Sequence, residues 1–518
     1  MKNMTMKKIL LLLLTLVCVN SCNKLDLEPL DRINAEEYYK TSADFDAAIF
    51  ASYSSIQDFW GTSSETLGES GEYWKLTLAT TDDVAANANN GGPILLDHLT
   101  FFPTDIAFAA LYTQIYEGIM RANLVLQNLD GDNDLTDEEK GHYEGEARFL
   151  RAFFHFEALK MWGTPPLVTS SVTTFTDVNS LKKPNATQEE LYAQILEDFQ
   201  HAFELLPEAW DAGNTGRATR WAARAFEGKV NVWKEDWDEA IAAFEDVLTN
   251  GPYHLIDTGD PAKDLADVFA FDNENNAESI FEVQFAGPFA DDNLWVFDDT
   301  HTEAVKASQG IARTLYWDAA NGAPGGKSGW YEPTQDLVDA FEPDDARLEA
   351  FIYQDGDEYY TTSDNLEPVP YDPTWSSTGY IIKKYRGQRN SAAGNYSANI
   401  EVDFNNERIF RLAELKLLYA EALIERGRTV DAAQQINDIR HRAGLPDLDP
   451  AADLTEAMRH EKRIELAFEP HRWFDLVRWD IGADVFPEEW DGKLSLFPFP
   501  QIEVDRVGKD MLKQNHGY

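Results

Sequence analysis

Apolar and aromatic positions recur at intervals of three and four residues in long stretches of both terminal parts of the chain. Within residues 141–162 these positions include Phe149, Phe153, Phe156 and Leu159. This spacing places an apolar stripe along one face of an α-helix, as packing against a core requires. The pattern therefore predicts a long helix with a buried face over residues 141–162.

Residues that start and stop helices define further elements. Thr187 and Glu190 have the spacing of a capping box, in which two side chains satisfy the first free N–H groups of a helix. Thr136 and Glu139 have the same spacing ahead of the helix described above. The other helices that the pattern predicts cover residues 105–129, 187–206, 405–426 and 429–443.

Two helical pairs carry a spacing typical of tetratricopeptide repeats, in which small, small, aromatic and proline residues stand at fixed offsets. The first set is Gly228, Ala240, Phe244 and Pro252. Ala420, Ala432 and Ile436 repeat the first part of that spacing. Ordinary helical hairpins give the same pattern, because small residues let any two helices approach closely. We expect a mostly α fold with a tetratricopeptide-like helical scaffold.

The middle of the chain lacks this periodicity. Gly, Pro, Asn, Asp and Ser cluster there repeatedly, which predicts turns and irregular loops. Two short runs, 279–285 and 380–385, have the residue types of strands and are expected to pair locally. We therefore predict one compact domain, with a helical part at 22–250, a loop-rich ligand-binding region at 251–400 and a second helical part at 401–518.

The first residues have the pattern of an export signal. Lys7 and Lys8 precede a short apolar run that ends just before Cys22. The run is too short to span a bilayer, which needs about 20 residues, so we expect residues 1–21 to be removed. Cys22 resembles the cysteine of a bacterial lipobox, which becomes the lipidated first residue. An ordinary secretion signal that happens to end near a cysteine is the alternative interpretation.

Composition limits the partners of the protein. The chain has two cysteines, so removal of the signal leaves Cys22 alone and no internal disulfide can form. The formal charge is -47, and loss of Lys2, Lys7 and Lys8 with the signal takes it to -50. Such a charge repels nucleic acid, anionic lipid and polyanionic ligands, so no nucleic-acid partner is expected. Adaptation to salt explains the charge equally well.

No motif for catalysis, cofactor binding or metal binding survives inspection. Asp130, Asp132 and Asp134 have the spacing of a calcium loop, but Leu135 replaces the glycine that the turn needs. His460 lacks the second histidine of a zinc-protease helix. We expect a protein that is not an enzyme and that has no cofactor, no catalytic residue and no metal site.

Several blocks of sequence resemble SusD/RagB-type outer-membrane lipoproteins. The longest runs over 461–479 and reads EKRIELAFEPHRWFDLVRW. The chain departs from the family pattern at Pro470 and His516, which are local changes of the backbone. The other matching blocks are 146–154, 162–167, 496–500, 514–518 and the stretch 25–29 after Cys22.

The resemblance implies a non-catalytic nutrient-binding protein on the cell surface. Such proteins act as a lid on a TonB-dependent transporter resembling SusC, and lipid on Cys22 would attach this one to the outer membrane. The leading ligand class is a neutral glycan oligosaccharide, because the acidic surface disfavours polyanions. A peptide, as the RagB branch implies, is the runner-up, and an enzyme at the cell surface is the third hypothesis.

Tryptophans in irregular segments are the candidate sugar platforms, because aromatic faces complement the C–H faces of a pyranose ring. Core or loop packing is the competing role for each of them. Asp82, Asp83 and Asn89 are the candidate partners for hydroxyl groups. The candidate platforms are Trp74, Trp295, Trp317 and Trp330.

Overall fold

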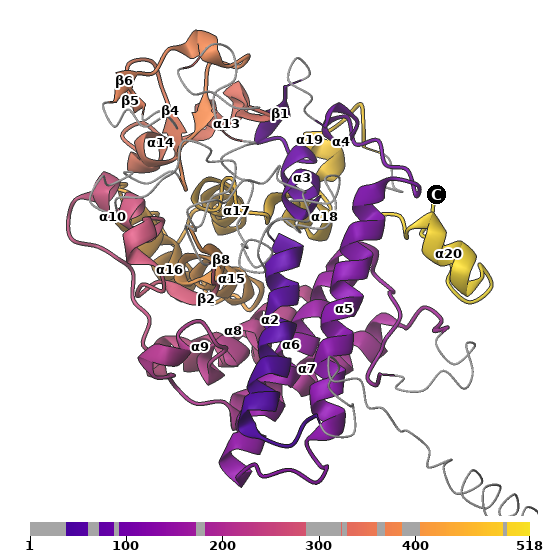
Figure 1. Ribbon diagram of the computed structural model, residues 1–518. Coiled ribbons are helices and arrows are strands. Elements are labelled where there is room, and N and C mark those ends of the chain that lie inside the picture. The colour runs from indigo at the N-terminus through magenta and orange to yellow at the C-terminus, as the bar shows by residue number, and fades with distance from the viewer. Residues whose placement is uncertain are drawn as a thin grey trace, which may run out of the picture.

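The computed structural model contains mainly α-helices, with a few short strands in the upper left of Figure 1. This confirms the mostly α fold that the periodicity predicts. The residues that the structure describes are 38–60, 72–87, 93–171, 182–285, 317, 323, 329–359, 368–385, 405–490 and 495–518.

Long helices of the N-terminal part pack side by side and form the lower half of the molecule (Figure 1). Both predicted capping boxes are present, because Thr136 and Thr187 each accept a hydrogen bond from the N–H of the glutamate three residues later. The helices are α2 (Ser42–Trp60), α5 (Ile106–Asn128), α6 (Asp137–Trp162), α7 (Gln188–Leu205), α8 (Arg220–Trp233) and α9 (Trp237–Asn250).

Glycines set the closest approaches between these helices. A Cβ added at Gly118 of α5 would lie 2.1 Å from the Phe154 ring of α6. A Cβ at Gly228 of α8 would lie 2.5 Å from the Phe244 ring of α9. Gly228 and Phe244 are the small and aromatic positions of the predicted repeat, so the aromatic ring fills the space that the small residue leaves.

The second copy of the repeat spacing lies in α15 (Leu412–Glu425) and α16 (Thr429–Arg442). These helices pack against each other, and α15 also packs against α8 and α9. The Phe244 and Tyr419 rings have centroids 6.2 Å apart. The two helical pairs thus form one continuous scaffold, which is consistent with tetratricopeptide-like repeats.

Two sequence-based expectations about strands are wrong. The predicted helix at 405–426 begins instead with strand β8 (Glu407–Arg411), and β2 (Ser279–Val283) pairs with it antiparallel rather than locally. In the same way β7 (Ile381–Ile382) pairs with β4 (Ile352–Tyr353). All five residues of β8 are buried, so the strand lacks the alternation of apolar and polar residues that identifies a half-exposed strand.

The middle of the chain also contains short helices. They lie in the upper left of Figure 1 beside the small strands, where Tyr353, Tyr359 and Tyr371 form a satellite apolar cluster. Short helices of other segments lie nearer the top and right of the view. The elements of the middle region are α10 (Pro261–Val268), α13 (Gln335–Ala340), α14 (Ala346–Phe351), β3 (Tyr331–Pro333), β5 (Glu358–Tyr359) and β6 (Val369–Pro370). The others are α3 (Glu72–Ala79), β1 (Val84–Ala86), α4 (Ile94–Asp97), α19 (Gly482–Val485) and α20 (Gln501–Val507).

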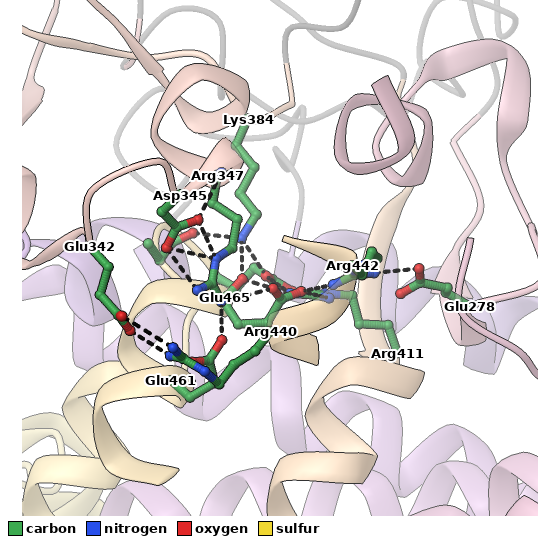
Figure 2. A network of polar contacts seen from close by, with 12 residues as sticks. Glu278, Glu342, Asp345, Arg347, Lys384, Arg411, Arg440, Arg442, Glu461 and Glu465 are labelled. Carbon is green, nitrogen blue, oxygen red and sulfur yellow. Dashed lines mark hydrogen bonds and ion pairs between the residues drawn. The ribbon is translucent and has the colours of Figure 1, made fainter. Parts of the chain in front are cut away.

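The matching block at 461–479, which we call the signature block, covers the end of α17 (Leu454–Glu465), a turn and α18 (Arg472–Arg478), and its carboxylates are buried. Figure 2 shows Glu465 at the centre of a network of ion pairs. Arg411 donates to it over 2.6 Å, and Arg442 and Arg347 also pair with it. Because these arginines come from separate elements, one carboxylate joins α17 to β8, α14 and α16. The block is therefore a structural junction.

Among the described residues, no helix is both long enough and apolar enough to cross a membrane.

Candidate ligand-binding face

The predicted hydroxyl partners Asp82 and Asp83 are bound by two arginines of the signature block. Arg472 donates to both oxygens of Asp82 over 2.8 Å. Arg463 donates to Asp83 over 2.8 Å and pairs with Asp82 at 2.9 Å. The structure thus brings residues separated by nearly four hundred positions into one four-residue clamp.

Burial and pairing perturb the two carboxylates in opposite directions. Burial raises the pKa of Asp83, and the neighbouring negative charge of Asp82 adds to that rise. Burial also opposes ionisation of Asp82, but the Arg472 hydrogen bonds and the positive charges of Arg472 and Arg463 together outweigh burial and lower the pKa of this carboxyl. Both carboxylates have guanidinium partners, which gives them a structural role, and their contact with ligand hydroxyls stays a prediction.

The clamp positions a short strand pair at the top of Figure 1, where β1 lies beside α3 and α13. β1 and β3 are antiparallel, with Ala85 opposite Glu332. The chain then continues from β1 into Asn87, whose N–H donates to the Trp330 carbonyl over 2.9 Å. The Asn87 side chain donates to Glu332 over 2.8 Å. We call β1, β3 and Trp330 the strand-pair platform.

A turn at 376–380 is fastened to this platform through Glu332. The buried Glu332 carboxylate accepts hydrogen bonds from the backbone N–H groups of Ser377, at 2.9 Å, and Thr378, at 3.3 Å. Beyond the turn, the Tyr380 hydroxyl donates to Gln335 over 3.1 Å. Ser377 and Gln335 are exposed, so polar groups border the platform in an arrangement suited to hydroxyl-bearing ligands.

Trp330 is half-buried in the platform. The Lys75 ammonium of α3 lies 5.7 Å from the centroid of its ring and is itself paired with Glu72 at 2.6 Å. A cation over an aromatic ring holds the ring in place. Of the predicted tryptophans that the structure describes, Trp330 alone retains a partly exposed side chain.

Trp74 and Trp317 lie in the core beneath this face. Each is 2% exposed, and their ring centroids are 5.2 Å apart. Both rings also contact Tyr385. A stacking platform needs an open ring face, so this placement corrects the expectation for these two residues: they support the core. The buried Trp74 indole N–H has no hydrogen-bond partner.

Three predicted residues lie outside the described residues: Asn89, Trp295 and the lipidation residue Cys22. No pattern in the sequence pointed to Glu332, which fastens the turn at 376–380, or to Lys75 beside Trp330. Arg463 and Arg472 lie in the matching block 461–479, but only the fold identifies their carboxylate partners. No group of three or more His, Cys, Asp or Glu able to hold a metal occurs in the described ranges.

Two family models match separate parts of the chain. The model described as "SusD family" matches residues 277–495, and the model described as "Starch-binding associating with outer membrane" matches residues 39–232. SusD-like protein P25 of Formosa agariphila is 24% identical over 542 residues, covering 96% of this chain and 97% of that protein. Sequence similarity therefore extends over nearly the whole chain.

Solved structures show the same fold. A SusD-like protein of Bacteroides fragilis has a TM-score of 0.76 at 26% identity, covering 95% of this chain and 100% of that chain. Surface glycan-binding protein A of Bacteroides thetaiotaomicron, in complex with laminarihexaose, has a TM-score of 0.71 at 22% identity. That comparison covers 92% of this chain and 100% of that chain.

Proposed function

Because this chain belongs to the SusD family, we propose that it binds oligosaccharides without catalysis and delivers them to a SusC-like TonB-dependent transporter. The observation that carries the proposal is the similarity along nearly the whole chain to SusD-like proteins. One protein of the same fold is described as a surface glycan-binding protein in complex with laminarihexaose. The ligand class proposed here follows from that relationship.

The strand-pair platform is the site that we propose for the oligosaccharide. It offers the partly exposed Trp330 ring together with exposed polar residues, Gln335 and Ser377. Trp330 is positioned by backbone pairing and by Lys75, so little side-chain freedom is lost when a sugar stacks on it. Asn89 and Trp295 remain candidate contacts from the sequence.

A neutral glycan suits the charge of the protein. The formal charge of -47 creates a potential that repels uronic-acid and sulfated polymers at low ionic strength. A neutral chain meets no such repulsion and is held by ring stacking and hydroxyl hydrogen bonds. We therefore propose a neutral oligosaccharide, with a peptide as the alternative.

We propose that the protein works at the outer face of the outer membrane, attached through lipid on Cys22. Two attachments, one to lipid and one to the transporter, keep the binding face near the pore. The effective ligand concentration at the pore then exceeds what a free binding protein of equal affinity supplies.

Calorimetry against neutral oligosaccharides, acidic oligosaccharides and peptides tests the ligand class. Laminarihexaose is a suitable first neutral probe because a protein of this fold is known with it. We expect heat of binding with at least one neutral oligosaccharide. Trp330→Ala should weaken that binding about tenfold, because it removes the stacking surface while leaving the β1–β3 pairing intact.

Trp210→Ala is the matched control, since Trp210 is also half-buried but lies near Arg217, away from the platform. This control should retain the affinity of the unmodified protein. Binding of peptides alone would replace the glycan proposal by the peptide-binding one. Equal losses of affinity in both variants would show that Trp330 does not contact the ligand.

A further inference from the structure

A cavity of about 230 Å³ lies on the helical scaffold, between the ends of α8, α15 and α18 and one side of α17. At ~30 Å³ per water it has room for roughly eight waters, which is comparable to one pyranose ring. Its apolar wall includes Val232, Ile424 and Met458, and three half-buried tryptophans complete it. The tryptophans are Trp233, Trp237 and Trp479.

One end of the cavity is already saturated with hydrogen bonds. Arg478 donates to both oxygens of Glu421, over 2.5 and 2.7 Å, and the Trp479 indole N–H donates to the same carboxylate over 2.8 Å. The Arg478 and Arg459 guanidinium groups also lie 4.8 and 5.3 Å from the Trp479 ring. Trp479 and Glu421 are therefore fixed walls, which leaves the other groups available to a ligand.

Other residues that line the cavity, which we call its rim, have polar atoms without hydrogen-bond partners. Glu235 and Glu425 line the cavity with exposed carboxylates, and Thr455 adds a hydroxyl. The Arg459 Nε is a buried donor with no hydrogen-bond partner. Acceptors, a donor and the Trp237 ring thus surround one small volume. Alternating donors and acceptors next to an aromatic face match the hydroxyls and C–H face of a sugar.

The backbone at Glu235 supports a role for this rim. Asp236 donates from its N–H to the Asn231 carbonyl, which is the long hydrogen bond of a Schellman motif with Glu235 at the left-handed position. Glu235 has φ of 61°, a value that favours glycine. α15 and α16 end with the same bond pattern but place Gly427 and Gly444 there, and α18 places Asp480, a residue type that adopts this conformation more readily than glutamate.

The strained glutamate is informative because glycine would cap α8 with less strain. A non-glycine residue that keeps a strained backbone conformation is a candidate for a functional role of its side chain. Here the side chain reaches the rim of the cavity. We propose that this cavity is a second sugar site, which takes a single neutral hexose unit between Trp237, Glu235, Glu425 and Arg459.

The choice of a sugar as ligand rests on the proposed function, whereas the cavity and its strained rim do not. The site lies between helices of the repeat scaffold and is built from residues other than those of the strand-pair platform. It would hold one unit of a glycan at a second point of the molecule. Two contacts on one glycan chain raise its apparent affinity without improving either site.

Saturation-transfer NMR with glucose, galactose, mannose and fucose tests the site on the full chain. We expect saturation transfer to at least one hexose. Trp237→Ala and Glu235→Gly should each weaken that binding by about tenfold or more. Glu235→Gly is the sharper variant, because relief of backbone strain should keep or raise the melting temperature while the carboxylate is lost.

Glu239→Gln is the control, since Glu239 is an exposed residue of the first turn of α9 that does not line the cavity. This variant should keep hexose binding. Unchanged transfer in both cavity variants, or no transfer to any hexose while oligosaccharides still bind at the platform, would overturn the second site. Preference for glucosamine or lysine amide over neutral hexoses would overturn it in favour of a cation site.

Failure of the proposed function looks different in the same experiments. In that case no oligosaccharide binds in calorimetry, while hexose transfer that depends on Trp237 and Glu235 still supports the cavity site. The two ideas can therefore fail separately.

Discussion

His155 shows how one buried side chain makes the stability of the protein depend on pH. The ring is fully buried in α6, the Val168 N–H donates to Nε2 over 3.2 Å, and Nδ1 lies 3.0 Å from the Arg151 carbonyl. Nε2 accepts a hydrogen bond, so Nδ1 carries the proton of a neutral ring. Burial lowers the pKa of His155 to about 4 from an ordinary value of 6.5.

This lowered pKa predicts acid destabilisation. Above pH 6.5 the histidine is neutral in both the folded and the unfolded chain, so its full contribution to stability is present. As the pH falls from 6.5 to about 4, only the unfolded chain gains a proton, and the free energy of unfolding should drop by about 3 kcal/mol. Chemical denaturation at a series of pH values measures this.

His155→Gln should be less stable at pH 7 but should lose much of the slope between pH 6.5 and 4. His441→Gln is the control because His441 is exposed, and it should keep the slope. A slope that is the same in all three proteins would assign the acid sensitivity to other groups, such as His471, whose pKa burial also lowers, and the carboxylates.

At the scale of single residues, the sequence predicted residue types better than residue roles. Trp74 and Trp330 stand in similarly aromatic, polar surroundings along the chain, yet one is core and the other is partly exposed. Burial depends on which distant segments cover a side chain. For Trp74 these include Trp317 and Tyr385, more than two hundred positions away, and no local pattern contains that information.

At the scale of elements, the contact between α5 and α6 depends on a missing side chain. A methyl group at Gly118 would lie 2.1 Å from the Phe154 ring, so Gly118→Ala must push these helices apart or rotate the ring. Overpacking of this kind costs about 1–3 kcal/mol, which exceeds the gain of ~1 kcal/mol from replacing a helical glycine. We expect lower stability in thermal and urea unfolding.

Gly141 of α6 provides the matched comparison. The nearest atom to an added Cβ there is a Leu205 methyl carbon at 3.7 Å, which is ordinary contact. Gly141→Ala should therefore raise stability by up to about 1 kcal/mol through helix propensity alone. If both variants shifted the midpoint in the same direction, propensity rather than packing would control this helix pair.

Helices were predictable where the hydrophobic period, the capping residues and the helix-breaking residues agree, as they do for α6 and α7. β8 was not, because Glu407, Arg408 and Arg411 give it a polar composition although all three are buried. Distant partners satisfy these charges, as Glu465 does for Arg411. A polar composition therefore wrongly predicts exposure for a strand whose charged residues the fold pairs and buries.

At the scale of the whole molecule, attachment and ligand binding should be separable. The described core and the strand-pair platform do not include Cys22. Cys22→Ala should release the protein from the membrane fraction of a host that processes lipoproteins, while calorimetry of the purified protein should give unchanged affinity. Loss of both properties would mean that the cysteine also has a role in folding.

The family could be predicted from the sequence because the matching blocks are spread along the chain and each has a recognisable composition. How these blocks lie relative to one another in space could not be predicted. Asp82 and Asp83 meet Arg463 and Arg472 only in the folded chain, and α17 is joined to three other elements through Glu465 (Figure 2). Such pairings depend on the path of the whole chain.

The end of α6 is held by residues near the C-terminus, so this contact can form only after the whole chain has been made. The Trp162 indole N–H donates to the Pro498 carbonyl over 3.1 Å, and Phe497 bonds to the Met161 carbonyl, across 336 positions. At ~5–20 residues per second, synthesis of that interval takes on the order of 20–70 s. Until the last residues emerge, the N-terminal helices lack this closing contact. This late contact is compatible with the export that residues 1–21 predict, because an exported chain passes through its channel before it folds.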